Sequence, residues 1–449
     1  MTPIVESRAW KALGALSVGL FLTLLDQSLV AVALPKIQED LGASLNQAVW
    51  VSAVYLLTFA VPLLITGRLG DRYGQRNIYL AGMAVFTLAA LACVFAPSIE
   101  WLIAARAVQG LGGSLLNPQP LSIIHKIFAH DRRGAATGVW SAVASSAGLF
   151  GPVIGGVLVG WISWRAVFLV YVPLGLISLF MVARYVPKLP TGTSKIDWLS
   201  GAVSLVAVLG VVLALQQGPE LGWGTLIWVS LAVGIAAAVL FIWMQTRSKA
   251  PLMPLRIFKT RNFAIGAFSI FSLGFTVYSV NLPIMLYLQT AQGMSSQLAG
   301  LMLVPMGIIS VVMSPVIGRL VDRLAPGMIS KIGFGALIFS MALMAVFMIS
   351  NLSPWWLLIP IILFGSSNAM SFAPNSAIAL RDVPQDLVGS ASGFYNTSRQ
   401  VGAVLGAATL GAVMQIGVGT VSFGVAMGAA ILVTLVPLIF GFLAVTQFR

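Results

Sequence analysis

The sequence predicts an all-α, polytopic membrane protein built from two related six-helix halves, with a helix pair inserted between them. Three observations support this class: the composition, a series of apolar segments that can cross a bilayer, and a short motif that occurs twice. Of the 449 residues, 59% are hydrophobic and 8% are charged, whereas soluble globular chains carry about 25% charged residues. A chain with so few charged residues must have a surface that faces lipid.

Fourteen apolar segments of roughly 20 residues follow one another, and each can cross the hydrocarbon core as a helix. The first follows Arg8 and Lys11, as in a signal peptide, but it has no small-residue cleavage site, so we interpret it as an uncleaved span. No stretch is left for a sizeable soluble domain. The spans are predicted at residues 12–34, 48–67, 77–96, 101–122, 135–160, 165–185, 198–216, 223–244, 262–289, 296–318, 328–350, 354–379, 388–415 and 422–446.

The basic residues predict the orientation of these spans. A net charge of +13 is compatible with nucleic-acid binding, but Lys and Arg are spread over the connections and not clustered. With a cytoplasmic N-terminus, only Lys36 and Arg165 lie outside, and only Arg106 and Arg399 fall more than four residues inside a predicted span. The positive-inside rule therefore places both termini in the cytoplasm, and it explains the charge without a nucleic-acid partner.

An internal repeat divides the chain into halves. The run Gly67-Arg68-Leu69-Gly70-Asp71-Arg72 after the second span recurs as Gly318-Arg319-Leu320-Val321-Asp322-Arg323 after the tenth. Both copies are predicted to lie in a cytoplasmic loop at the same place in a six-helix set, as in a parallel repeat. We therefore expect an N-terminal bundle at 1–187, two linking helices with cytoplasmic connections at 188–255, and a C-terminal bundle at 256–449.

Further motifs occur in a fixed order and carry a family resemblance. Span 1 has Leu25-Asp26 and Val32-Ala33-Leu34-Pro35, the loop motif continues as Tyr73-Gly74-Gln75-Arg76, and span 4 has Arg106-Ala107-Val108-Gln109-Gly110. Span 5 has Gly148, Gly151-Pro152 and Gly155-Gly156, and span 6 starts with Trp164-Arg165, Phe168 and Val172-Pro173-Leu174-Gly175. Over essentially its full length the chain resembles the major facilitator superfamily, and within it the fourteen-span drug:proton antiporters.

The resemblance implies the major facilitator fold and a function in transport. It implies a proton-coupled antiporter of the bacterial inner membrane that exports small lipophilic compounds by alternating access, as in multidrug efflux and antibiotic resistance. The expected partners are this substrate, protons and the bilayer; we expect a monomer with no cofactor or metal. The alternative is an exporter of an endogenous lipid or metabolite with the same proton coupling, which shares every motif.

Asp26 and Arg106 are the predicted proton-coupling residues. Asp26 is the one carboxylate within a predicted span, and burying it unpaired is costly, so it must face a cavity or a partner and titrate during transport. At about 1.5 Å per helical residue, Arg106 lies within roughly one turn of its depth. The alternative for both residues is a permanent structural ion pair. The resemblance also makes Arg106 a coupling residue, which would stabilise the ionised carboxylate until the helices separate.

Two motifs predict contacts that open and close the protein. Gly148, Gly151, Pro152, Gly155 and Gly156 permit close helix packing and a bend, either as plain packing or as a seal between the halves against ion leak. The resemblance makes the doubled motif a cytoplasmic gate, with Asp71 binding basic residues; the alternative is a turn flanked by arginines that follow the positive-inside rule. The predicted gate residues are Gly67, Gly70, Asp71, Arg72, Gly74, Arg76, Asp322 and Arg323.

Aromatic, methionine and amide side chains of the C-terminal half predict an adaptable substrate cavity, although such residues also face lipid. Arg399 lies about 16 Å into its span with no acid at that depth, so it binds helix-end carbonyls, Asn396 or Gln400, or faces an aqueous cavity. The predicted cavity residues are Phe271, Phe275, Tyr278, Asn281, Met285, Gln289, Met306, Asn368, Asn375, Asn396 and Arg399.

Charge and residue type also exclude some functions. One carboxylate against two arginines within the spans argues against doubly charged cations, so we expect neutral or singly charged substrates. The resemblance of the span 5 glycine motif to that of antiporters disfavours a proton-coupled importer. An intramembrane enzyme is disfavoured because His125 and His130, with only Asp131 nearby, form no catalytic set, and the single Cys93 excludes a multi-cysteine metal site.

Overall fold

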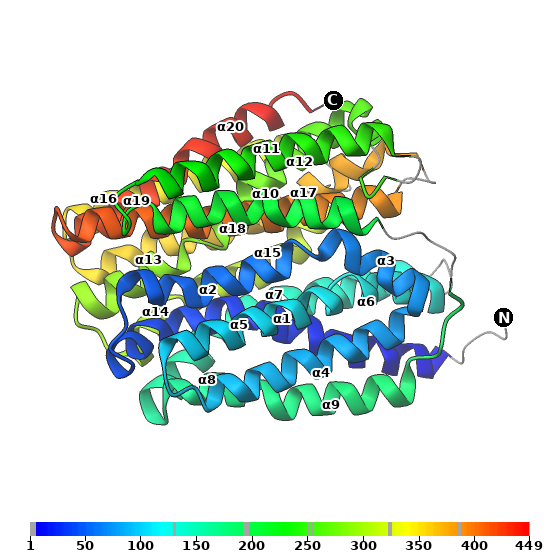
Figure 1. Cartoon of the computed structure of the whole chain (residues 1–449), viewed down its shortest axis with the longest axis horizontal. Coiled ribbons are helices and arrows are strands. Elements are labelled where there is room, and N and C mark those ends of the chain that lie inside the picture. The colour runs from blue at the N-terminus through cyan, green and yellow to red at the C-terminus, as the bar shows by residue number, and fades with distance from the viewer. Residues whose placement is uncertain are drawn as a thin grey trace.

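The structure is a computed structural model that describes residues 6–128, 132–191, 197–248, 251–253, 255–321, 326–384 and 388–448. Helices account for all regular secondary structure within these ranges. Most of them run nearly parallel to the long axis, so that the molecule is an elongated bundle (Figure 1). The end of the bundle opposite the start of the first helix is called the far end below. The chain crosses the bundle repeatedly, as a polytopic membrane protein does.

The first part of the bundle contains the helices up to Tyr185. Three of the predicted spans continue past a break into a further helix, namely α2 into α3, α5 into α6 and α8 into α9. The first helix is longer than the predicted span 12–34 and extends toward both ends. The helices are α1 Glu6–Asp40, α2 Leu45–Ala60, α3 Leu63–Tyr73, α4 Gln75–Val94, α5 Ile99–Leu116, α6 Gln119–Ile127, α7 Arg133–Trp161, α8 Trp164–Leu169 and α9 Tyr171–Tyr185.

The second part begins after the linking helices and is also helical throughout its described residues. It contains short 3₁₀ and π turns beside the α-helices. The elements are η2 Leu255–Lys259, α12 Arg261–Val277, α13 Asn281–Leu286, η3 Tyr287–Ala291, α14 Ser296–Met302, α15 Val304–Val321, α16 Pro326–Ile349, η4 Pro354–Leu357, α17 Leu358–Arg381, α18 Val388–Val418, α19 Phe423–Val433 and α20 Leu435–Val445.

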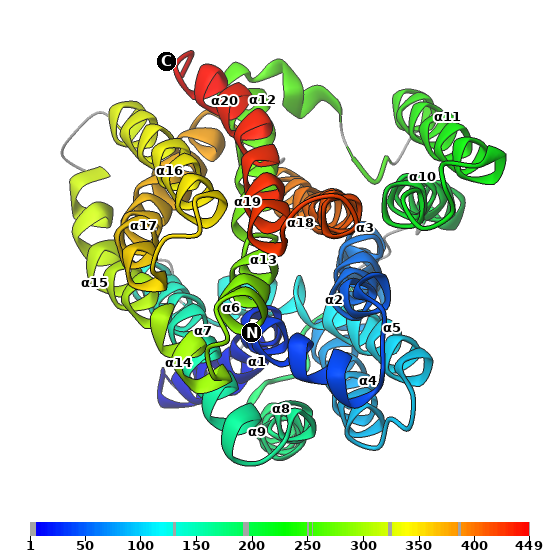
Figure 2. The same ribbon diagram turned by 90° about the vertical axis from the view of Figure 1, so that its left-hand side faces the viewer.

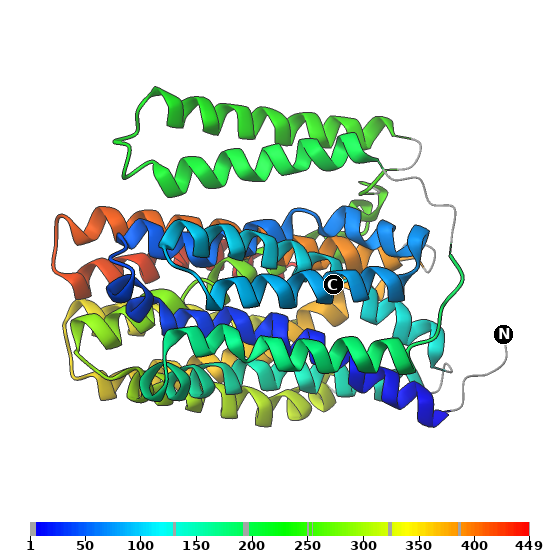
Figure 3. The same ribbon diagram turned by 60° about the horizontal axis from the view of Figure 1, so that its bottom comes forward.

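The linking helices α10 Trp198–Gln217 and α11 Thr225–Arg247 form an antiparallel pair beside the other helices. Figure 3 shows the pair as a separate layer, and the end-on view in Figure 2 places it next to α2, α3 and α18. Only α10 packs closely on the bundle, through α18, α2 and α3. Since α11 carries many exposed apolar side chains, such as Leu226, Val233 and Leu240, its outer face is suited to contact lipid.

Several predicted spans are broken into two helices, and the breaks have a common cause. Proline lacks an N–H and its ring clashes with the carbonyl four residues earlier, so a helix tends to end within the preceding turn. Each of these breaks ends at a proline or within one turn before it. The breaks lie near Val61, Asn117, Val170, Tyr278, Leu303 and Thr434, and the prolines are Pro62, Pro118, Pro173, Pro283, Pro305 and Pro437. At the first of them, α2 and the following helix are bent by 51°.

In the part of the chain that the structure describes, fewer helices than the fourteen predicted spans are both long enough and apolar enough to cross a membrane. Within the described residues, 11 helices are long and apolar enough to cross a membrane, or up to 12 if the bent pair α2–α3 is taken as one span. The predicted spans 101–122 and 135–160 do not meet this criterion, although α5 and α7 lie among the other helices (Figure 1). The protein is therefore a multi-pass membrane protein, and fourteen spans remain a prediction.

The motif predicted to form a loop after the second span is mostly helical, so that prediction is wrong. Residues 67–73 belong to α3, and the chain turns at Gly74, where φ is +94°. Glycine adopts this conformation without strain because it has no Cβ. The second copy is likewise helical up to Val321, the end of α15, while Asp322 and Arg323 lie outside the described residues. Helical propensity within the run therefore outweighs its two inner glycines.

The two halves meet chiefly along four helix pairs. Helix α7 packs against α14 and α15, α2 packs against α18, and α1 packs against α13. The end-on view in Figure 2 shows α7 next to α14 and α15 on one side of the bundle, and α2 next to α18 on the other. Helix α1, which also packs on α7 and α9, runs close to the middle. A polar residue halfway along α1 is therefore placed near the boundary between the halves.

Candidate functional site: a buried ion pair beside a central cavity

Asp26 and Arg106 form a two-fold salt bridge in the interior. Arg106 Nη1 donates to Asp26 Oδ1 and Nη2 to Asp26 Oδ2, each at 2.7 Å. The two residues are 0% and 1% exposed, and they are the only fully buried charged residues in the described part of the chain. The contact between α1 and α5 agrees with the depth argument. Opposite charges held this close offset the large cost of removing both from water.

Arg106 has further partners from α2, α5 and α8. Its Nε donates to the Val51 carbonyl at 3.1 Å, and its Nη1 donates to Gln109 Oε1 at 2.8 Å. The Tyr55 ring lies 4.2 Å from the guanidinium carbon, which is a cation–π geometry. Gln109 in turn donates to Asp26 Oδ1 at 3.4 Å. The Phe168 ring lies 5.8 Å from the guanidinium carbon, so the guanidinium has four partners besides the carboxylate.

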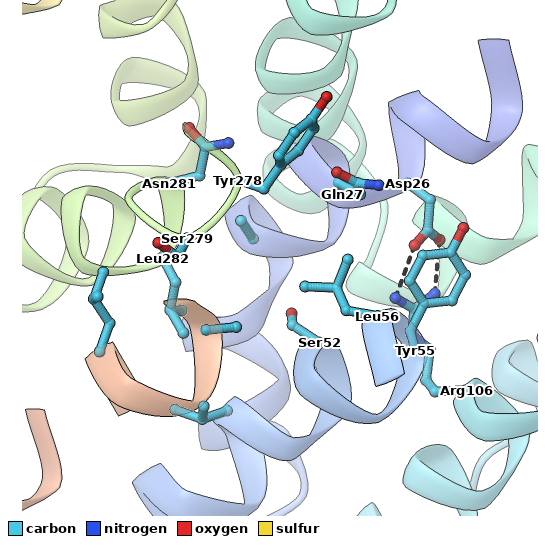
Figure 4. A pocket seen from close by; sticks show the side chains of 14 residues that line it. Asp26, Gln27, Ser52, Tyr55, Leu56, Arg106, Tyr278, Ser279, Asn281 and Leu282 are labelled. Atoms are coloured by element: carbon cyan, nitrogen blue, oxygen red, sulfur yellow. Dashed lines mark hydrogen bonds and ion pairs between the residues drawn. The ribbon is translucent and has the colours of Figure 1, made fainter. Parts of the chain in front are cut away.

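The pair forms part of the wall of a small cavity between the two halves. The cavity has a volume of about 30 Å³, which is enough for about one or two waters and far below the size of a drug-binding pocket. In Figure 4 the pair lies on one side, with Gln27 and Tyr278 near it and Asn281 farther across. The cavity is lined by Asp26, Gln27, Ala31, Val49, Ser52, Tyr55, Leu56, Arg106, Tyr278, Ser279, Asn281, Leu282, Ala407 and Leu410.

Some polar atoms around this cavity have no hydrogen-bond partner. Both side-chain polar atoms of Gln27 and the Oδ1 of Asn281 are buried and unpaired within the described structure. Leaving such groups unpaired costs about 1–3 kcal/mol each. They can be satisfied by water or by polar groups of a ligand, so they suit a cavity that fills and empties.

The glycine motif of span 5 lies on α7 and packs on two neighbours. A Cβ on Gly151 would lie 1.9 Å from Ser28 Oγ of α1, whereas one on Gly156 would lie 2.9 Å from the Ser296 carbonyl of α14. Across the same contact, a Cβ on Gly300 would lie 2.3 Å from the Pro152 carbonyl. Gly155 packs on α1 with Gly151, and Gly148 lies in the same helix. Pro152 and Gly156 therefore lie at a close contact between the halves, whereas Gly151 and Gly155 pack within the first half.

Most of the predicted cavity residues lie elsewhere in this conformer. Tyr278 and Asn281 line the central cavity, and Arg399 lies beside Tyr278, its guanidinium carbon 5.8 Å from the centre of the ring. Gln289 lies nearer the far end, where it donates to the Val32 carbonyl and accepts from Ser296. The other predicted residues do not line the cavity: Phe271, Phe275, Met285, Met306, Asn368, Asn375 and Asn396.

Two of these residues have an evident structural role. Asn375 is fully buried; it accepts a hydrogen bond from Ser269 and donates one to the Tyr395 hydroxyl, which joins α17, α12 and α18. Met285 is fully buried within α13 in the apolar core of the second half. Both are therefore held by the packing of the second half and not exposed to a ligand in this conformer.

The predicted gate residues are distributed around α3 and the start of α4. Asp71 is exposed and accepts a hydrogen bond from Gln75, and no ion pair to it is found in the described part of the chain. Arg76 donates to the Ala183 carbonyl, and Arg72 lies over the ring of Tyr73. Gly67 and Gly70 are inside α3, where Gly70 allows the side chain of Gln119 to approach. The role of these residues as a gate stays a prediction.

Sequence reasoning missed Tyr55, Val51 and Gln27 as parts of the site. Gln109 belongs to a motif that the sequence does contain, and its position three residues after Arg106 places both on one helix face. Tyr55 and Val51 carry no such signal, because an aromatic ring or a carbonyl on an apolar helix resembles any other. Gln27 adjoins Asp26 and is detectable as a second polar residue inside a span.

Comparison with known proteins identifies the family. The family model described as Major Facilitator Superfamily matches residues 16–407. An uncharacterised transporter of this type from Mycobacterium tuberculosis is 39% identical over 406 residues, 90% of this chain and 70% of the relative. The multidrug resistance protein Stp of the same species is 34% identical and aligned over 89% of this chain and 75% of its own. The methylenomycin A resistance protein of Bacillus subtilis is 31% identical, with 89% and 86% covered.

Solved structures agree with the fold. The crystal structure of a D-xylose–proton symporter has a TM-score of 0.68 with 14% sequence identity, and the match covers 96% of this chain and 97% of that one. At this identity the likeness concerns the fold alone. With the family model matching most of the chain, the protein belongs to the Major Facilitator Superfamily and is a membrane transporter.

Proposed function

We propose that the protein is a proton-coupled antiporter that exports small lipophilic, neutral or singly charged compounds by alternating access. It would lie in the inner membrane of a bacterium with both termini in the cytoplasm, as a fourteen-span drug:proton antiporter. The observation that carries the proposal is the position of the Asp26–Arg106 pair at the wall of a cavity between the two halves. Its carboxylate is the one buried acid of the described chain.

The contacts of Arg106 allow this pair to open. Removing one member of a buried ion pair typically costs about 3–5 kcal/mol, because the other charge is left uncompensated. Here the guanidinium keeps the Val51 carbonyl, Gln109 and the Tyr55 ring when the carboxylate leaves or accepts a proton. A water in the adjoining cavity can deliver that proton. Protonation of Asp26 would then weaken the link between α1 and α5 and favour movement of the halves.

The relatives support export as the direction of transport. Those named above include a multidrug resistance protein and a methylenomycin A resistance protein, and other relatives bear the names of a multidrug efflux pump and of a tetracenomycin C resistance and export protein. Apolar side chains of Leu56, Leu282 and Leu410 around the cavity suit a lipophilic substrate. The close α7–α14 contact would seal the protein against proton leak while the two halves move between the inward-open and outward-open states.

Substrate flux in liposomes tests the coupling. Purified protein is reconstituted with a fluorescent lipophilic compound that carries one fixed charge and therefore does not redistribute with pH by itself, and an imposed pH gradient is the only driving force. The wild type should drive this compound against its concentration gradient, and Asp26→Asn should not, because the amide cannot exchange the proton. Exchange of substrate down its own gradient should persist in the variant, which shows that it is folded.

The matched control is Glu39→Gln, which removes an exposed carboxylate from the far end of the same helix. This variant should behave as the wild type. Gradient-driven transport that survives Asp26→Asn would place the proton site elsewhere, and failure of both variants would point to helix α1 in general.

A further inference from the structure

Arg399 is a charged residue deep in the second half. It lies in α18, eleven residues after the helix begins at Val388, which corresponds to a depth of about 16 Å. A guanidinium at such a depth is costly unless it meets a counter-charge, a backbone acceptor or water. The question is therefore what partner satisfies it.

Close backbone packing holds Arg399 in place. A Cβ on Gly274 of α12 would lie 2.0 Å from the Arg399 carbonyl, and a Cβ on Gly402 would lie 2.2 Å from the Phe271 carbonyl. The backbones of α12 and α18 therefore approach each other closely at the level of this residue.

Within the described residues, the guanidinium of Arg399 has a contact with an aromatic ring but neither an ion-pair partner nor a hydrogen-bond acceptor. Its guanidinium carbon lies 5.8 Å from the centre of the Tyr278 ring. Its Nε is buried without a hydrogen-bond acceptor, and no carboxylate of the described chain forms an ion pair with it. Arg106, in contrast, has a carboxylate, an amide, a carbonyl and a ring. The guanidinium of Arg399 therefore has hydrogen-bond donors free for a ligand, whereas that of Arg106 is bound by its neighbours.

The charge balance around the cavity is positive. The charges of Asp26 and Arg106 cancel, so the uncompensated charge near the central cavity is that of Arg399. Tyr278 connects the two places, since its ring both lies by Arg399 and lines the cavity. Gln27 and Asn281, which carry unpaired amide atoms, line the same cavity. A ligand that extends from the cavity past Tyr278 thus meets a guanidinium and amide groups.

We propose that Arg399 binds a negatively charged oxygen group of the exported molecule, such as a carboxylate, so that the protein prefers lipophilic monoanions to neutral or cationic compounds of the same shape. The guanidinium fork matches two carboxylate oxygens and is strengthened by the low dielectric of the site. The apolar walls bind the remainder of the molecule. This substrate class rests on the proposed export function.

Three matched fluorescent probes test the preference by binding to the purified protein. Dansyl-leucine is a monoanion, its methyl ester is neutral, and dansylcadaverine is a monocation, while the dansyl group is common to all. The wild type should bind the monoanion at least about tenfold more tightly than the ester, as expected for one hydrogen-bonded charge pair. Arg399→Gln should abolish this preference, and Arg399→Lys should retain part of it, because the charge stays and the fork is lost.

Several outcomes overturn the assignment. Equal binding or no binding of the three probes by the wild type does so without any variant, and a preference for the monocation does so as well. Arg399→Gln that weakens all three probes equally would show a structural role instead. Because binding is measured without a gradient, the assignment is independent of coupling: a wild type that prefers the monoanion but never exchanges it for protons refutes antiport and leaves Arg399 as the anion site.

Discussion

Complete burial distinguishes Asp26 and Arg106 from every other charged side chain of the described chain. Their contact alone is compatible with a permanent structural pair. Whether the pair can open during transport depends on the other groups around each partner, because those groups determine the free-energy cost of pulling the two charges apart. Gln109 contacts both members of the pair, and it is therefore the residue most suited to hydrogen-bond each of them while they move apart.

Replacing Gln109 with leucine should slow transport without changing substrate affinity. A hydrogen bond to a charged group contributes about 1.5–3 kcal/mol, so separation of the pair should become roughly tenfold slower or more, while the cavity wall is unchanged. Initial rates of gradient-driven flux in liposomes measure kcat and KM separately. The control is Ser114→Ala in the same helix, whose hydroxyl bonds only to the Leu111 carbonyl. A change in KM alone would contradict the interpretation.

At the scale of elements, glycine positions on α7 and α14 decide how closely the halves approach. At Gly156 and Gly300, the groups that a new Cβ would meet are main-chain atoms of the opposite helix, which cannot rotate away as a side chain can. The contact is therefore intolerant of even one methyl group. Gly14 of α1 is a useful contrast, since no atom lies within 4 Å of a Cβ built on it.

Gly300→Ala should lower the thermal stability of the detergent-solubilised protein and increase proton leak through liposomes. Overpacking of this kind typically costs about 1–3 kcal/mol. Gly14→Ala, also within a helix, should be neutral or slightly stabilising, since alanine favours a helix over glycine by about 1 kcal/mol. Differential scanning fluorimetry and a pH-sensitive dye inside the liposomes are the measurements. Equal effects of the two substitutions would argue against a seal at α7–α14.

At the scale of the whole molecule, a cluster of amide side chains joins three parts of the chain near the far end. Asn46 of α2 donates to Gln217 and to Glu220 and accepts from Gln216, which belong to the linking pair and its turn. Gln415 of α18 also donates to Asn46. One residue thus connects the first half, the linking pair and the second half. Movement of α2 away from α18 must break this cluster.

Asn46→Leu should therefore favour opening at the far end. In a Cys93→Ser background, a cysteine placed at Val49, a residue of the cavity wall, should react several-fold faster with an impermeant maleimide added from the outer side. Gln47→Leu is the matched control, because Gln47 bonds to Glu100 within the first half. An unchanged labelling rate in Asn46→Leu would show that the cluster does not restrain the two halves.

The sequence by itself determined the membrane class, the approximate helices and the contact of Asp26 with Arg106. These follow from costs that apply at every point in a bilayer: polar backbone must be helical, and a buried charge must have a partner at its own depth. The doubled motif was found as a repeat but assigned to a loop, since glycines also occur inside helices that pack closely, as Gly70 does.

Only the tertiary structure decided which faces line the cavity. Tyr278 lines it whereas Met285, seven residues later, is in the core, and Tyr55 lies over the guanidinium of Arg106. In water, an apolar stripe indicates the buried face of a helix. In a membrane the lipid-facing and core-facing sides are both apolar, so the sequence pattern does not distinguish them, and the helix rotations are set by packing between segments far apart in the chain.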